Sequence, residues 1–169
     1  MKGSKYMSNI VLLVVDVQNA LINAHPHNEQ KVIRNIKQLI ITARDNKKEV
    51  LYIRHDDGEG TELENGTYGW QIYDKISPNS NELIYEKQYN SAFHKTHLKE
   101  YLDSKNIDTI ILVGLQTEYC IDATCKIAFD NDYLSGEKLY EFYNYKIWNK
   151  RFADVIAVEE VIKILESNF

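Results

Sequence analysis

The stretch TIILVGLQTEYCIDATC, from Thr109 to Cys125, constrains the fold of this chain more than any other part of the sequence. It begins with β-branched and aliphatic residues without polar alternation, which is typical of a strand covered on both faces. Gly114 ends this run, and Thr117 is suited to cap a helix over about Glu118–Phe129. A strand, a tight turn and a helix in this order predict one unit of a parallel α/β sheet.

Cys120 falls in the first turn of that predicted helix, and two interpretations of it stay open. The unpaired N–H groups of a helix N-terminus lower the pKa of a thiol, which favours a nucleophile. Free cysteine is also often a small buried hydrophobe. Cys125 lies deeper in the same helix, where we expect it to pack. The spacing of the two cysteines disfavours a disulfide and a redox role, and it fits a reducing compartment.

Length and composition predict one soluble domain over residues 1–169, in which residues 1–8 are a leader or an added remnant. If Met7 is the natural start, Met1 to Tyr6 are the remnant. The formal net charge of −5 argues against nucleic acid and anionic membranes as partners. Ile10–Val15 is the longest aliphatic run and is too short to span a bilayer. We therefore expect a cytoplasmic protein.

Hydrophobic patterning places the remaining elements. Strands are predicted at Ile10–Val15, Val50–Ile53, Leu83–Tyr85, Thr109–Val113 and Val155–Val158. Helices are predicted after Asn28 as N-cap, from Thr96, over Glu118–Phe129, from Ser135 or Gly136 to Phe152, and over Glu159–Glu166. The alternation predicts a doubly wound, Rossmann-like α/β fold whose mostly parallel sheet carries helices on both faces.

Three residues with ionisable, potentially reactive side chains follow predicted strands: Asp16, Lys87 and Cys120. Taken singly, Asp16 is as easily a turn residue and Lys87 a solvated charge. The carboxyl ends of parallel strands meet at one edge of the sheet, so the three side chains are expected to converge there. A carboxylate can accept the thiol proton, and an ammonium stabilises the resulting thiolate.

These residues lie in motifs that resemble the isochorismatase-like cysteine hydrolase family. The matching segments are VVDVQNA at 14–20, EKQYNSAF at 86–93 and GLQTEYCIDATC at 114–125. The resemblance implies Asp16 as general base, Cys120 as nucleophile and Lys87 as the group that orients and charges the pair. It also implies a cis peptide between Leu115 and Gln116, an oxyanion hole made by the N–H groups of Gln116 and Cys120, and a homo-oligomer.

The reaction implied is hydrolysis of the C–N bond of a small-molecule amide through a thioester on Cys120, without a cofactor. The metal site of the family's nicotinamidases is not expected, since His55, Asp56 and Asp57 are adjacent and are interpreted as a solvated acidic loop. We assign Gln18, Trp70 and Tyr119 to substrate binding, with Trp70 either a pocket wall or a plug that packs the 54–80 loop. A vinyl ether hydrolase of the isochorismate type is an alternative.

The resemblance also draws attention to one departure after the Cys120 helix. Family members continue there with a strand, whereas Tyr133 is followed at once by LSGEKLYEF, which is typical of the start of a helix. We therefore expect that the sheet lacks this strand, whether by a true deletion or because a segment is missing from the chain. A sheet without it could misplace the catalytic residues, so an impaired family member that acts as a binding or structural protein is a second alternative.

Overall fold

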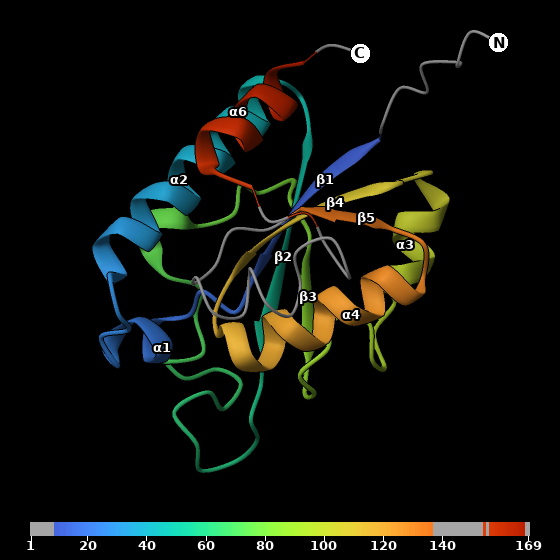
Figure 1. Cartoon of the computed structure of the whole chain (residues 1–169). Coiled ribbons are helices and arrows are strands. Elements are labelled where there is room, and N and C mark those ends of the chain that lie inside the picture. Colours follow the sequence, from blue (N-terminus) through green and yellow to red (C-terminus); the bar gives the residue numbers. More distant parts are fainter. Residues whose placement is uncertain (1–8, 137–153, 155, 168–169) are drawn as a thin grey trace, which may run out of the picture.

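The computed structural model describes residues 9–136, 154 and 156–167, and their centre is a sheet of parallel strands (Figure 1). The strand order is β3-β2-β1-β4-β5. The strands are β1 (Ile10–Val15), β2 (Glu49–His55), β3 (Ile84–Lys87), β4 (Thr109–Gly114) and β5 (Leu134–Gly136). Every pairing between them is parallel, which confirms the predicted doubly wound α/β class.

Helices cover both faces of this sheet (Figure 1). They are α1 (Asn19–Asn23), α2 (Glu29–Asp45), the 3₁₀-helix η1 (Asp74–Ile76), α3 (Leu98–Ser104), the π-helix η2 (Thr117–Ile121), α4 (Asp122–Asp130) and α6 (Val158–Glu166). α2 and α6 pack on one face, and α3 and α4 on the other. Within the described part of the chain, no helix has the length and apolar character needed to cross a membrane.

β1 lies between the two layers, and this position explains its unbroken aliphatic sequence. Successive side chains of a strand point to opposite faces. Leu12 therefore belongs to the core beneath α2 and α6, and Leu13 to the core beneath α3 and α4. Both residues are 0% exposed, so neither face of the strand tolerates a polar residue.

The expected loss of a strand after the Cys120 helix is wrong. Leu134–Gly136 forms β5, which pairs in parallel with Thr109–Ile111 of β4. Its three residues include Ser and Gly, which have weak strand propensity, so hydrophobic patterning could not identify it. The helix predicted from Ser135 or Gly136 therefore cannot begin there, and its remainder lies outside the described residues.

The strand predicted at Val155–Val158 is also wrong where the structure describes it. Ile156 and Ala157 are irregular, and Val158 already begins α6. The predicted last helix is confirmed, as is the long helix after Asn28. Thr117 does not cap its helix: Gln116 occupies the cap position and makes no side-chain cap hydrogen bond.

The strand order creates a switch point between β1 and β4. The chain proceeds outward from β1 to β2 and β3 and then returns to the other side of β1. In open α/β sheets, the crevice that binds ligands lies beyond the carboxyl ends of the strands at such a point. A ligand-binding site is therefore expected at the residues that follow β1 and β4.

Candidate active site

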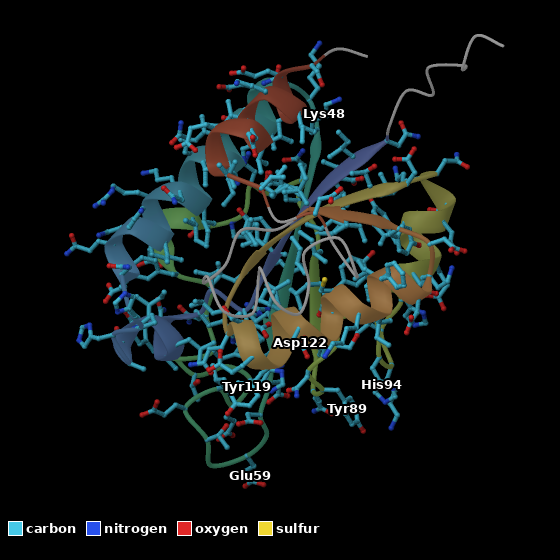
Figure 2. All side chains as sticks on the ribbon, viewed as in Figure 1. Lys48, Glu59, Tyr89, His94, Tyr119 and Asp122 are labelled. Carbon is cyan, nitrogen blue, oxygen red and sulfur yellow. The ribbon has the colours of Figure 1, made fainter. Side chains whose placement is uncertain are left out.

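Each of the four longer strands delivers one reactive side chain to the same end of the sheet. Asp16 follows β1, His55 and Lys87 are the last residues of β2 and β3, and Cys120 lies in η2 after β4. Figure 2 shows Tyr89, His94 and Tyr119 at this end of the molecule, whereas Lys48, which precedes β2, lies at the opposite end.

The Lys87 ammonium is the centre of the site. Its Nζ lies 2.7 Å from Asp16 Oδ2 and 3.2 Å from Cys120 Sγ, and it lies 2.9 Å from His55 Nδ1. The side chains of Lys87 and Asp16 are 0% and 1% exposed. The predicted convergence of Asp16, Lys87 and Cys120 is therefore confirmed, and the charge of the buried ammonium is compensated by a carboxylate in contact with it.

The backbone near the site is shaped by close approach of β1 and β4. Gly114 pairs with Val15 and has φ +142°, and a Cβ at this position would lie 2.0 Å from the Val15 carbonyl oxygen. The next peptide, Leu115–Gln116, is cis, as the family resemblance implies. Asp16 itself has φ +53°, and its N–H donates to the Ile53 carbonyl. Only glycine fits at position 114.

Burial sets the protonation of the Asp16 and Cys120 side chains. Burial, followed by the charge of Asp16, raises the pKa of Cys120 to about 12, and Lys87 opposes this shift. Burial also raises the pKa of Asp16, although Lys87 and a hydrogen bond with Cys120 act against it. The lowered thiol pKa predicted from the helix N-terminus is therefore wrong, because desolvation outweighs it. The resting thiol keeps its proton beside a base that can take it.

His55 is a part of the site that sequence reasoning missed. It is 9% exposed, so its assignment to a solvated loop is wrong, whereas Asp57 is 63% exposed as expected. β2 extends to His55, and β3 pairs His55 with Lys87, which places both side chains on one face of the sheet. The available signal was its position at the end of a strand, which it shares with Lys87.

Asp16, His55 and Cys120 would also form a candidate metal-ligand set, because their ligand atoms lie within 4.8 Å of one another. Lys87 Nζ already stands among these atoms, at hydrogen-bonding distance from each. A zinc ion would need ligand distances of about 2.0 to 2.3 Å in the same space. The arrangement thus fits an ammonium as its cation.

Gln18 has a structural role rather than the predicted contact with substrate. It is 0% exposed, and its Nε2 donates to the carbonyl oxygens of His55 and Trp70, both at 2.8 Å. Its Oε1 accepts from the His55 N–H at 2.9 Å. These bonds use the amide group to fasten the end of β2 to the following loop, and they leave no exposed atom for a ligand.

The other two predicted contact residues differ from each other. Trp70 is partly buried, and the Arg54 guanidinium carbon lies 3.3 Å from its ring centroid, which agrees with the packing interpretation. Tyr119 is 55% exposed beside Cys120 in η2 (Figure 2). A further neighbour that the sequence did not single out is Asn90, whose Oδ1 lies 4.0 Å from Cys120 Sγ.

The fold and the site together define an α/β protein with a buried carboxylate, ammonium and thiol at the sheet switch point, and the family follows from comparison with known proteins. Residues 11–135 match the isochorismatase domain, so the chain belongs to the isochorismatase family. This confirms the resemblance drawn from the three motifs.

Similar proteins include family members and one named amidase. The chain is 30% identical over 120 residues to the uncharacterized isochorismatase family protein YrdC of Bacillus subtilis, which covers 69% of this chain and 64% of that protein. It is 27% identical over 110 residues to N-carbamoylsarcosine amidase of Arthrobacter sp, covering 60% of this chain and 42% of that protein. The matches thus span less than two-thirds of these relatives.

The fold is similar to that of solved structures along nearly the whole chain. An isochorismatase-like hydrolase from Alkaliphilus metalliredigens superposes with a TM-score of 0.83 at 22% sequence identity. The superposition covers 96% of this chain and 99% of the other.

Proposed function

We propose that this protein is a cysteine hydrolase that cleaves the C–N bond of a small-molecule amide through a thioester on Cys120. The observation that carries the proposal is the contact of one buried ammonium, Lys87, with both the Asp16 carboxylate and the Cys120 sulfur. The similarity to an amidase supports the choice of an amide over a vinyl ether.

The first half of the reaction forms the thioester. Asp16 takes the proton of Cys120, and the thiolate attacks the amide carbonyl carbon while Lys87 stabilises the negative sulfur. The N–H groups of Gln116 and Cys120 are proposed to bind the oxyanion of the tetrahedral intermediate. The intermediate collapses, the C–N bond breaks, and protonated Asp16 gives its proton to the leaving amine.

The second half regenerates the enzyme. Asp16, again a carboxylate, takes a proton from water as the water oxygen attacks the thioester carbonyl. The C–S bond then breaks, a carboxylic acid leaves, and Cys120 recovers its proton from Asp16. No metal or cofactor is needed in this scheme, because Lys87 supplies the positive charge.

A screen of small amides tests the proposal. Primary amides and N-carbamoyl amines would be assayed for release of ammonia or amine, with wild type, Cys120→Ala and the matched control Cys125→Ala. We expect turnover in wild type and Cys125→Ala only, and an acyl adduct on Cys120 by rapid-quench mass spectrometry. Equal turnover by Cys120→Ala would overturn the proposal.

The assembly is a separate proposal. We expect a homo-oligomer, a dimer or larger, as family resemblance implies. Light scattering coupled to size-exclusion chromatography measures the mass directly, and a mass of 19.8 kDa across a range of concentrations would contradict this expectation.

A further inference from the structure

His55 takes no part in the proposed reaction, although its ring contacts the Lys87 ammonium. The side chain lies on the same face of the sheet as Lys87, because the two residues are partners in the β2–β3 register. Its Nδ1 lies 2.9 Å from Lys87 Nζ in a buried contact.

The hydrogen-bonding capacity of Lys87 determines which state His55 must adopt. An ammonium has three N–H donors and no acceptor. Its neighbours here are Asp16 Oδ2, Cys120 Sγ and His55 Nδ1, which provide one acceptor for each donor. His55 Nδ1 must therefore carry a lone pair, and the proton of the neutral imidazole sits on Nε2.

The surroundings of His55 fix this tautomer and the position of the ring. Its Nε2 faces Asp57 Oδ1 at 3.4 Å, where a carboxylate favours an N–H. The backbone N–H and carbonyl of His55 are both bonded to the buried Gln18 amide. The ring is thus attached to a rigid point on β2, and Nδ1 is directed at the ammonium.

We propose that His55 is a positioning residue that holds the Lys87 ammonium between Asp16 and Cys120. The inference rests on the proposed function and adds the group that keeps its cation in place. When Asp16 accepts the thiol proton it becomes a neutral acid and a weaker acceptor. His55 Nδ1 is unchanged by that transfer, so it retains one N–H of Lys87 while another stays directed at the sulfur.

Two substitutions separate the acceptor from the bulk of the ring. His55→Leu removes the hydrogen-bond acceptor but retains much of the bulk of the side chain. In His55→Asn, the amide Oδ1 can replace Nδ1 as the acceptor. His97→Leu is the matched control, because the His97 side chain is 93% exposed and lies outside the site. All variants are made with Cys125→Ala, so that iodoacetamide reports on Cys120 alone.

The readout is the pH profile of Cys120 alkylation together with kcat and KM on an amide found by the screen. In His55→Leu we expect the profile to move to higher pH, since Lys87 is less well held and lowers the thiol pKa less. We expect kcat to fall roughly tenfold to 100-fold, the effect typical of removing a supporting partner, and KM to change little. His55→Asn should recover most of both properties, and His97→Leu should match wild type.

Two results would overturn the positioning role. One is an unchanged alkylation profile in His55→Leu. The other is an equal loss of kcat in His55→Leu and His55→Asn, accompanied by an equal decrease in unfolding temperature. This result would mean that the ring only fills space. Alkylation needs no substrate, so a chain that hydrolyses none of the amides but still separates the two variants would refute the proposed function and keep the positioning role.

Discussion

At the scale of single residues, the chemistry of the site depends on whether Asp16 or Cys120 holds the thiol proton. Asp16 and Cys120 are both buried, and the pKa of each is raised. Solvent water is a poor acceptor for the thiol proton under these conditions, because the pKa of Cys120 reaches about 12. The adjacent carboxylate is the acceptor within reach, so the thiolate forms by internal transfer rather than by loss of the proton to solvent.

Asp16→Asn tests this internal transfer. We expect turnover to fall by about 10²- to 10⁴-fold, the usual contribution of a general base. The negative charge of Asp16 helps to raise the pKa of Cys120, so its removal should move the alkylation profile to lower pH. Asp45→Asn, on the exposed end of α2, is the control. A profile that stays in place or moves upward would contradict the account of the two charges.

Lys87→Met tests the compensation of the buried carboxylate. Leaving Asp16 unpaired should lower the free energy of unfolding by about 3 to 5 kcal/mol at pH 7.5. The raised pKa of Asp16 means that the folded state binds its proton more tightly than the unfolded chain, so the variant should regain stability as the pH falls toward 5. Urea unfolding at the two pH values measures the difference.

The control for this prediction is Lys99→Met. Lys99 pairs with Asp103 on the surface, where both side chains are about half exposed. Such an exposed pair is screened by solvent and contributes little to stability, so Lys99→Met should leave the free energy of unfolding nearly unchanged. Equal losses in Lys87→Met and Lys99→Met, or a loss in Lys87→Met that does not depend on pH, would show that the Asp16 charge is compensated elsewhere.

At the scale of elements, Gly114 sets how closely β4 can approach β1. In Gly114→Ala the new Cβ would meet the Val15 carbonyl in a strand that cannot move, and φ of +142° is unfavourable for alanine. We expect a loss above about 4 kcal/mol, which is exceptional for one substitution, measured by urea unfolding or by the yield of folded protein.

Gly66→Ala separates steric clash from backbone strain. Gly66 also has a positive φ, of +90°, but a Cβ added to it would meet no atom within 4 Å. The expected loss is about 1 to 3 kcal/mol, the cost of an unfavourable φ alone. Similar losses in the two variants would mean that close approach of β1 is not what requires Gly114.

The sequence predicted the elements whose burial is continuous. β1 is an unbroken aliphatic run, β2 and β4 each contain a buried apolar run, and the spacing of apolar residues along α2 indicates its single buried side. β5 was not predicted, because three residues are too few to show a hydrophobic pattern. The place of His55 in the site was not predicted, because its contact with Lys87 depends on the register between β2 and β3. The direction of the pKa shift of Cys120 was predicted wrongly, because it depends on burial. Neither quantity can be obtained from residue order alone.

At the scale of the whole molecule, two hydrophobic cores share one sheet. Leu12 and Leu13 are neighbours in β1 that serve opposite cores, and each is 0% exposed. β1 pairs with β2 on one side and β4 on the other, and its side chains enter both cores, so loss of either core removes the support of the same central strand. We therefore expect the described layers to unfold together as one domain.

Leu12→Ala and Leu13→Ala form a matched pair for this expectation. Each deletes the same buried atoms and should cost about 2 to 5 kcal/mol. Both should shift one transition in urea, with far-UV circular dichroism and tryptophan fluorescence changing at the same concentration. If the two faces were independent, one variant would split the transition while the other left part of the molecule at its original midpoint. Coincident shifts would mean that the strand ends carrying Asp16, His55, Lys87 and Cys120 are held by both cores at once.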